Sequence, residues 1–196
     1  MQEFHDFKKK KNFVSFFLSD GDNIQWMMQD FASRYYDVPE AEDVKMTFGL
    51  PVATLAMMAP VQFNNLMGLQ KQNCSLMEML GGGYYYVDTY SQDHNRKTNL
   101  RVAAKRLAVS MRQYQIKLLG IMAMDVKSEA AKEAYQVYVD ANDQLEGIVV
   151  LQYSPYAGGE GEVFWVTNKA GYDIPVITVK YSLWDRIHER EGSPDF

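Results

Sequence analysis

Apolar residues occur along the chain in short blocks, separated by longer stretches that mix apolar and polar positions. Three blocks of six to eight residues carry mostly aliphatic, aromatic or β-branched side chains with little polar alternation: residues 13–18, 117–124 and 147–153. This pattern is typical of strands covered on both faces, which belong to parallel sheets. Weaker blocks predict further strands at residues 44–50, 74–80 and 176–181, with one more short strand at 163–167.

Between these blocks, apolar residues recur every three or four positions, as they do on one face of an α-helix. One such stripe begins after Thr98, the predicted N-cap, and carries basic residues on its opposite face. Another begins after Ser128, where a serine followed by Glu129 is typical of a helix N-terminus. Two less regular helices are predicted at residues 23–36 and 61–72. Alternating strands and helices indicate βαβ units and a mostly parallel sheet.

A chain of 196 residues, 47% of them hydrophobic and 23% charged, can bury a core without disulfides or a metal. The aromatic share of 13% excludes disorder and low complexity. The sequence contains no run of about 18 apolar residues, so we expect no membrane span, and its start lacks the apolar core of a secretory signal. With no repeat or linker, we expect a lead-in at 1–12, one α/β domain at 13–185 and a tail at 186–196.

The net charge of -5 argues against a nucleic-acid partner, because the chain has no excess of cations to neutralise phosphates. The one basic run, residues 8–11, is interpreted as a solvated lead-in. Cys74 is the sole cysteine and follows the pattern of a packing residue. A nucleophilic role would need a histidine nearby, and all three are remote in sequence: His5, His94 and His188.

In parallel α/β folds, reactive groups collect at the C-terminal ends of the strands. The predicted ends carry mainly acidic and aromatic side chains and no basic ones: 19–23 after the first strand, Pro51 after the second, 81–86 after the third, Asp125 after the fourth, 154–162 after the fifth, and Tyr181 and Trp184 after the last. Asp20 and Asp22 could converge on one ligand with separated pKa values. Alternatively, this segment caps the next helix and Gly21 relieves the turn. An EF-hand would need further ligands that the spacing lacks.

The run Gly81-Gly82-Gly83-Tyr84-Tyr85-Tyr86 is the second distinctive feature. Its glycines allow the backbone to approach a ligand closely or to adopt positive φ. No Gly-Lys-Ser/Thr follows, which excludes a phosphate loop. Consecutive tyrosines offer flat apolar faces with hydroxyl tips, which suit sugar rings. Alternatively, the run forms a tight turn whose tyrosines anchor the loop to the core.

Gly81-x-Gly83-Tyr84-x-Tyr86 resembles the motif that names the GxGYxYP putative glycoside hydrolases, specifically their C-terminal domain. Other segments are similar to that family as well, so the resemblance extends from about Phe13 to Trp184: Ser19-Asp20-Gly21-Asp22-Asn23, Tyr153-Ser154-Pro155-Tyr156 and Tyr181-Ser182-Leu183-Trp184. Val87 departs from the motif, which has proline there, so we expect a less rigid loop.

The resemblance implies a barrel-like α/β domain that follows a separate N-terminal domain in secreted bacterial proteins acting on glycans. An eight-fold barrel usually takes about 250 residues. Six or seven strands in 196 residues therefore predict a short or distorted TIM-like barrel. The expected partners are a carbohydrate substrate, with a neutral glycan favoured by the acidic charge balance, and the N-terminal domain of the parent protein. We expect no cofactor.

Glycosidic cleavage uses two carboxyl groups, about 5 Å apart for retention and about 6.5–9.5 Å apart for inversion. We predict Asp20 and Asp22 as one catalytic pole and Asp125 or Glu160 as the other. Asp125 follows four apolar residues, whose desolvation could raise its pKa; alternatively, it begins the following helix. Glu160 and Glu162 lie in a Gly-rich loop, where solvent-exposed residues are common.

The predicted substrate-binding residues combine stacking aromatics with flexible backbone: Asn23, Gly81, Gly83, Tyr84, Tyr86, Tyr156 and Trp184. Trp26 is assigned to the core, and His94 is interpreted as structural, although it could donate a hydrogen bond near the Gly-Tyr run. Two other classes are open. A carbohydrate-binding domain would keep the aromatic cleft without a working acid pair. A metal-dependent deacetylase would need two histidines on one helix face, and the chain has no such pair, so no metal site is predicted.

Overall fold

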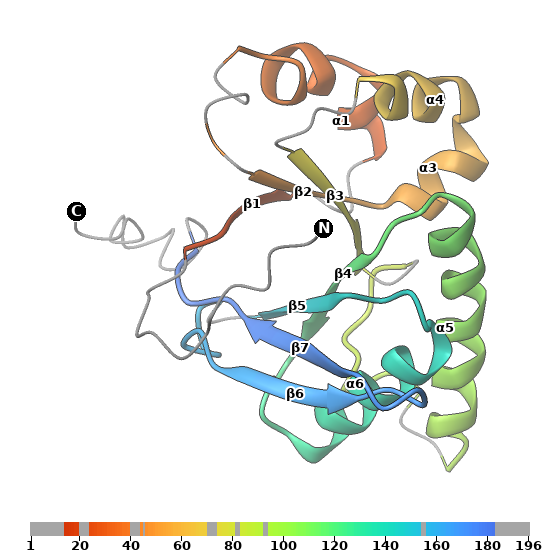
Figure 1. The fold of residues 1–196 in the computed structure, drawn as a ribbon, viewed down its shortest axis with the longest axis vertical. Helices are drawn as coiled ribbons and strands as arrows, with labels where there is room; N and C mark the ends of the chain where they lie inside the picture. The colour runs from red at the N-terminus through yellow and green to blue at the C-terminus, as the bar shows by residue number, and fades with distance from the viewer. Residues whose placement is uncertain are drawn as a thin grey trace.

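The computed structural model describes residues 14–19, 24–39, 44, 46–69, 74–80, 83–91, 94–153 and 156–182. Within them, one seven-stranded sheet has the order β1-β2-β3-β4-β5-β7-β6. Its strands are β1 (Phe16–Ser19), β2 (Met46–Leu50), β3 (Cys74–Met79), β4 (Leu118–Ala123), β5 (Gly147–Gln152), β6 (Val163–Thr167) and β7 (Asp173–Thr178). All neighbours are parallel except β6 and β7, which are antiparallel. The sheet curls into a half-barrel (Figure 1), which confirms the mostly parallel, distorted TIM-like fold.

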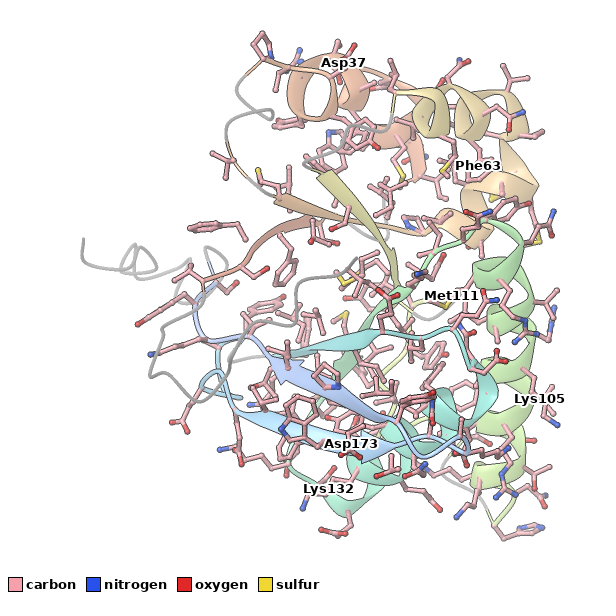
Figure 2. All side chains as sticks on the ribbon, in the orientation of Figure 1. Asp37, Phe63, Lys105, Met111, Lys132 and Asp173 are labelled. Atoms are coloured by element: carbon pink, nitrogen blue, oxygen red, sulfur yellow. The ribbon has the colours of Figure 1, made fainter. Side chains whose placement is uncertain are left out.

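The helices lie along the outer side of this curled sheet (Figure 1). They are α1 (Ile24–Met28), a π-helical turn η1 (Ala32–Tyr36), α3 (Val52–Met58), α4 (Pro60–Gly68), α5 (Arg96–Gln113) and α6 (Glu129–Ala141). Figure 2 shows how α5 divides its residues: Lys105 projects away from the sheet, and Met111 lies on the side that faces it. This is the apolar stripe that the three- and four-residue spacing predicts.

The two faces of the sheet bury different residues because side chains alternate along each strand. On β4, Leu119 and Ile121 belong to the main core under the helices. Met122 instead belongs to a smaller group on the inner face of the half-barrel. We call this group the inner cluster: Met77, Met79, Leu80 and Met122. Gly120 makes room for it, since an added Cβ would lie 2.4 Å from Met79 Sδ.

The predicted strands are confirmed, with shifts at their ends. β4 and β5 differ by about one residue from the predicted blocks, whereas β7 begins at Asp173 instead of 176. Pro175 hides this start, because proline is rare within strands, and it stands one residue before the pairing with β5 begins at Val176. β1 lies at the edge of the described sheet and is covered only in part: Leu18 packs against the main core and Phe17 against the inner cluster, whereas Phe16 is exposed.

The helix ends correct one prediction and confirm another. Ser128 caps α6, and its Oγ accepts a hydrogen bond from Ala131 N at 3.1 Å. Thr98 is not the N-cap of α5, which begins at Arg96 after Asn95. Arg96 fixes this earlier start because its guanidinium donates to Val87 O at 2.6 Å and to Ala130 O at 2.9 Å. α3 was not predicted, since its sequence VATLAMM has no polar face to reveal a helical period.

Candidate functional site

The Gly-Tyr run lies beside the C-terminal end of β4. Gly83 N donates to Leu80 O at 3.1 Å, which closes a turn directly after β3. Val87 N then donates to Met122 O at 2.9 Å, and Tyr86 forms a parallel bridge with Met122. The segment therefore continues the sheet beyond the end of β3, and its successive side chains point to opposite faces.

Four tyrosines make consecutive ring contacts on the inner face, and we call them the tyrosine row: Tyr84, Tyr86, Tyr153 and Tyr156. The ring centroids are 6.2 Å apart for Tyr84 and Tyr86 and 5.2 Å apart for Tyr86 and Tyr153. Tyr153 and Tyr156 are separated by 5.4 Å. Edge and tilted contacts of this kind are the favoured geometry for aromatic pairs. Tyr86 and Tyr153 pack on the inner cluster, and Tyr84 is 54% exposed, so the row has an apolar support and an open end.

Tyr85 points to the opposite face and anchors the run to the helices. Its hydroxyl hydrogen-bonds to the hydroxyl of Tyr138 on α6, and its ring lies 4.6 Å from that of Tyr90. Burial raises the pKa of Tyr85 to about 12. The two interpretations of the run therefore apply to different residues: Tyr85 is an anchor, and Tyr84 and Tyr86 belong to the row.

Asp88 connects this segment to the turn that follows β4. Its carboxylate accepts hydrogen bonds from Met124 N at 3.0 Å and from Asp125 N at 2.8 Å. Asp125 Oδ1 in turn accepts from Lys127 N at 2.9 Å, which makes Asp125 a turn residue at the start of α6. Asp125 is exposed, so the predicted desolvation is wrong. The chain leaves the sheet after Ala123, and the apolar residues before it are no longer packed around its side chain.

Lys127 lies among the acidic residues of this edge. Its Nζ is 3.0 Å from Glu162 Oε2 and 3.4 Å from Glu160 Oε2. Hydrogen bonds to Glu162 first, and to Glu160 second, raise the pKa of Lys127. The expectation that these strand ends carry no basic residue is therefore wrong. Lys127 stands only two residues after Asp125, so extending the predicted end of this strand by two residues would have included it.

The loop at residues 156–162, which carries Tyr156 and Glu160, is held tightly against the sheet. Thr178 Oγ1 lies 2.8 Å from Gly159 O and 3.0 Å from Glu162 O. A Cβ on Gly159 would lie 2.3 Å from Thr178 Cβ, so only glycine allows this approach. Glu160 adopts φ of +59°, in the left-handed region. The loop therefore has a defined shape despite its glycines.

The structure brings six of the predicted site residues to this edge of the sheet: Gly83, Tyr84, Tyr86, Asp125, Tyr156 and Glu160. Five others lie outside the described residues: Asp20, Asp22, Asn23, Gly81 and Trp184. Asp88 and Lys127 were not predicted as site residues. Trp26 packs against the core as predicted, and His94 is exposed with its Nε2 3.2 Å from Asn95 Nδ2.

Glu78 is a second acidic group that sequence reasoning missed, and it lies on the helix side of β3. It is 1% exposed, and its Oε2 accepts from Ala53 N at 2.8 Å. Burial raises the pKa of Glu78 to about 8, against the opposing effect of hydrogen bonds from the backbone of Ala53 and Val52. Its Oε1 has no hydrogen-bond partner among the described residues. Met77 and Met79, its neighbours on β3, face the tyrosine row, so Glu78 points away from it.

Two other features bear on the kind of site. A hollow of about 490 Å³ lies by η1 and α4, and none of its lining residues was predicted for the site: Ala32, Gln62, Asn64, Asn65, Gly68 and Leu69. In the part of the chain that the structure describes, His, Cys, Asp and Glu form no group of three that could hold a metal ion. Among the same residues, no helix has the length and apolar character needed to cross a membrane.

The family profile of the GxGYxYP putative glycoside hydrolase C-terminal domain matches residues 10–194. The match covers nearly the whole chain, and the chain belongs to this family. No curated protein and no solved structure matches the chain significantly. Membership confirms the resemblance carried by the Gly-Tyr run, with Val87 in place of the motif's proline. A proline at this position could not donate the hydrogen bond that Val87 N makes to Met122 O.

Proposed function

We propose that this domain cleaves glycosidic bonds of a neutral glycan at the edge formed by the ends of β3, β4 and β5. The observation that carries the proposal is that one edge combines the tyrosine row with two carboxylates, Asp125 and Glu160, that contact the same residue, Lys127. Aromatic rings and paired carboxylates are the parts that glycoside hydrolysis needs. The family name points to the same chemistry.

The tyrosine row would bind the sugar. Its rings offer apolar faces to the C–H surfaces of a pyranose, and their hydroxyls offer hydrogen bonds to sugar hydroxyls. Tyr84 provides the exposed end, and Tyr156 brings the other end into the same loop as Glu160. Lys127 is already paired with Glu160 and Glu162, so its charge is largely compensated and offers little attraction to an acidic glycan.

The carboxylates would divide the chemistry between a proton donor and a partner that acts as base or nucleophile. The ammonium of Lys127, 3.4 Å from Glu160 Oε2, complements an ionised carboxylate. Glu160 therefore suits the base or nucleophile role, and Asp125 on the turn after β4 is the alternative carboxylate for the same pole. Asp20 and Asp22, which follow β1 in the sequence, are the proposed second pole and the proposed source of the proton.

A non-catalytic carbohydrate-binding domain is the second candidate. Two observations favour it: Asp125 Oδ1 is engaged by Lys127 N, and the Glu160 side chain is 78% exposed. A catalytic carboxylate is more often held in a partly desolvated site. In this case the tyrosine row would bind the glycan without cleaving it.

A panel of neutral oligosaccharides, separated after incubation by chromatography, tests the proposal. We expect cleavage by the wild-type chain and a loss of about 100-fold or more in kcat for Asp125→Asn or for Asp22→Asn. Asp140→Asn is the matched control, because Asp140 is an aspartate on α6 whose side chain accepts a bond from Gln136. Binding without cleavage would favour the carbohydrate-binding function over the hydrolase. The absence of both binding and cleavage would contradict both functions.

The location and the wider protein are part of the proposal. We propose that the domain acts outside the cytoplasm, in a bacterial protein that also carries an N-terminal domain, since a glycan-acting family is compatible with that setting. Comparing the cleavage rates of this domain and of the parent protein tests whether the second domain contributes to the site.

A further inference from the structure

Among the described aspartates, Asp88 is the one whose carboxylate binds two amides of the turn after β4. Its two carboxylate oxygens accept hydrogen bonds from two consecutive amides, Met124 N at 3.0 Å and Asp125 N at 2.8 Å. A carboxylate that accepts two backbone N–H groups forms charge-assisted bonds and fixes the orientation of both peptide units. Asp88 therefore determines the direction in which the chain presents Asp125.

The support of Asp88 is itself fixed. Val87, the preceding residue, donates its N–H to Met122 O at 2.9 Å and accepts a bond from Arg96 Nη2 at 2.6 Å. Thr89 N donates to Tyr86 O at 3.2 Å. Asp88 thus sits on a segment tied to both β4 and α5, and Tyr86 of the tyrosine row belongs to the same segment. A rigid path of a few residues connects the row to Asp125.

The turn would keep its position without Asp88 but would lose its local order. Tyr153 N donates to Ala123 O at 2.9 Å on one side of the turn, and Tyr135 Oη donates to Val126 O at 2.8 Å on the other. These bonds anchor the residues on both sides of Met124 and Asp125. Removing the carboxylate of Asp88 should therefore loosen these two residues without unfolding the domain.

We propose that Asp88 is a positioning residue that holds Asp125 in register with the tyrosine row. The inference rests on the proposed function, since it assigns Asp88 a role in the same site. Asp88 acts through the backbone of Asp125 and is not itself assigned to the reacting groups. Misplacing a reacting group by about 1 Å can lower a rate by about 100-fold, so a loosened turn should affect the chemical step more than binding.

Asp88→Asn tests the role, because it keeps the size of the side chain and replaces one acceptor oxygen with a donor. With a cleaved oligosaccharide from the neutral panel, we expect kcat to fall by about tenfold or more while KM changes by less than about threefold. Asp140→Asn should change neither. In the Asp125→Glu background, where the carboxylate is already displaced, Asp88→Asn should lower kcat by less than about twofold, because the two effects are coupled.

Amide hydrogen exchange gives a readout that does not depend on activity. In Asp88→Asn, exchange at Met124 and Asp125 should become faster by about tenfold, while exchange in β5 stays unchanged. Where the wild-type chain cleaves a glycan, three results would each overturn the positioning role alone. They are an unchanged kcat in Asp88→Asn, fully additive effects of Asp88→Asn and Asp125→Glu, and unaltered exchange at these two amides. If the wild-type chain cleaves no glycan, whether or not it binds one, the hydrolase function and this role are both overturned, even where exchange accelerates.

Discussion

Glu78 and Asp125 lie at the ends of neighbouring strands, β3 and β4, and both follow apolar residues, yet the fold treats them in opposite ways. Glu78 is within its strand and points to the helices, where it is 1% exposed and its pKa is raised to about 8 by burial. Asp125 comes two residues after its strand ends and is exposed. Two things therefore decide which acid is desolvated: the face of the sheet to which its position in the strand directs it, and whether the strand still includes it. The apolar residues that precede it in the sequence do not decide this. The helix side of the sheet thus holds the structural acid, and the inner face holds the candidate site.

The largest expected effect is on the helix side and depends on pH. The pKa of Glu78 is raised from 4.5 to about 8. Between these values the folded chain keeps a proton that the unfolded chain releases, so the unfolded state binds fewer protons and the free energy of unfolding falls as pH rises. The contribution of protonated Glu78 to the free energy of unfolding is full below about pH 4.5. It is lost towards pH 8, with a slope of roughly 1.4 kcal/mol per pH unit.

Urea unfolding of Glu78→Gln between pH 5 and 8 checks this expectation. The variant should lose most of the slope and exceed the wild type in stability at the upper end of the range. Glu146→Gln is the control, because Glu146 is an exposed glutamate paired with Lys117. If Glu78→Gln and the wild type show the same slope of stability against pH, Glu78 is not the source of the pH dependence.

Gly159→Ala acts on the inner side through packing. The added Cβ would lie 2.3 Å from Thr178 Cβ, so the loop that carries Tyr156 and Glu160 must shift. We expect the free energy of unfolding to fall by about 1–3 kcal/mol. Gly68→Ala is the control, since its Cβ would meet nothing within 4 Å. Thermal melts of the two variants compare them, and equal melting temperatures would contradict the tight loop contact.

Tyr85→Phe tests the anchoring of the Gly-Tyr run. It leaves the hydroxyl of Tyr138, which is buried, without the bond that Tyr85 provides. We expect a loss of about 1–2 kcal/mol, part of which Tyr85→Phe combined with Tyr138→Phe should recover, because the second change removes the unpaired hydroxyl. Tyr84→Phe should have little effect on stability. Chemical denaturation of all four chains measures these differences, and an equal loss in Tyr84→Phe would contradict the division of the run.

Lys127→Gln should have the smallest effect on stability. Its partners, Glu160 and Glu162, are exposed, and solvent-exposed ion pairs contribute little. The melting temperature should change by less than that of Gly159→Ala, and the difference from the wild type should shrink further as salt is added. A large loss of stability that salt does not reduce would show that Lys127 has a structural role beyond these ion pairs.

Local periodicity was enough to predict the class of fold. The apolar blocks of β4 and β5 and the capped stripe of α6 each carry a period that tertiary packing then satisfies. α3 was missed because a helix with apolar residues on every side has no period to detect. The start of β7 was missed because Pro175 conceals a strand whose pairing with β5 begins one residue later.

The candidate site could be predicted where its residues lie in the loops that follow the strands. Tyr84, Tyr86 and Asp125 follow from the rule that parallel strands end at one edge. The contacts of Asp88 and Lys127 could not be found in this way, because they cross between loops: Asp88 reaches a residue 37 positions away, and Lys127 reaches one 33 positions away. Such contacts depend on how the loops pack, which no local pattern encodes.

Titration of the isotope-labelled chain with neutral hexasaccharides, followed by amide and tyrosine ring signals in NMR spectra, tests the central claim most directly. The series would include cello-, xylo- and mannohexaose and fully N-acetylated chitohexaose, so that no single sugar has to be assumed. We expect the shifts to concentrate on the tyrosine row and on the turn that carries Asp125, with Glu78 and Tyr85 unaffected. Shifts centred on the hollow lined by Gln62, Asn64 and Asn65, or no shifts with any of the sugars, would contradict the assignment.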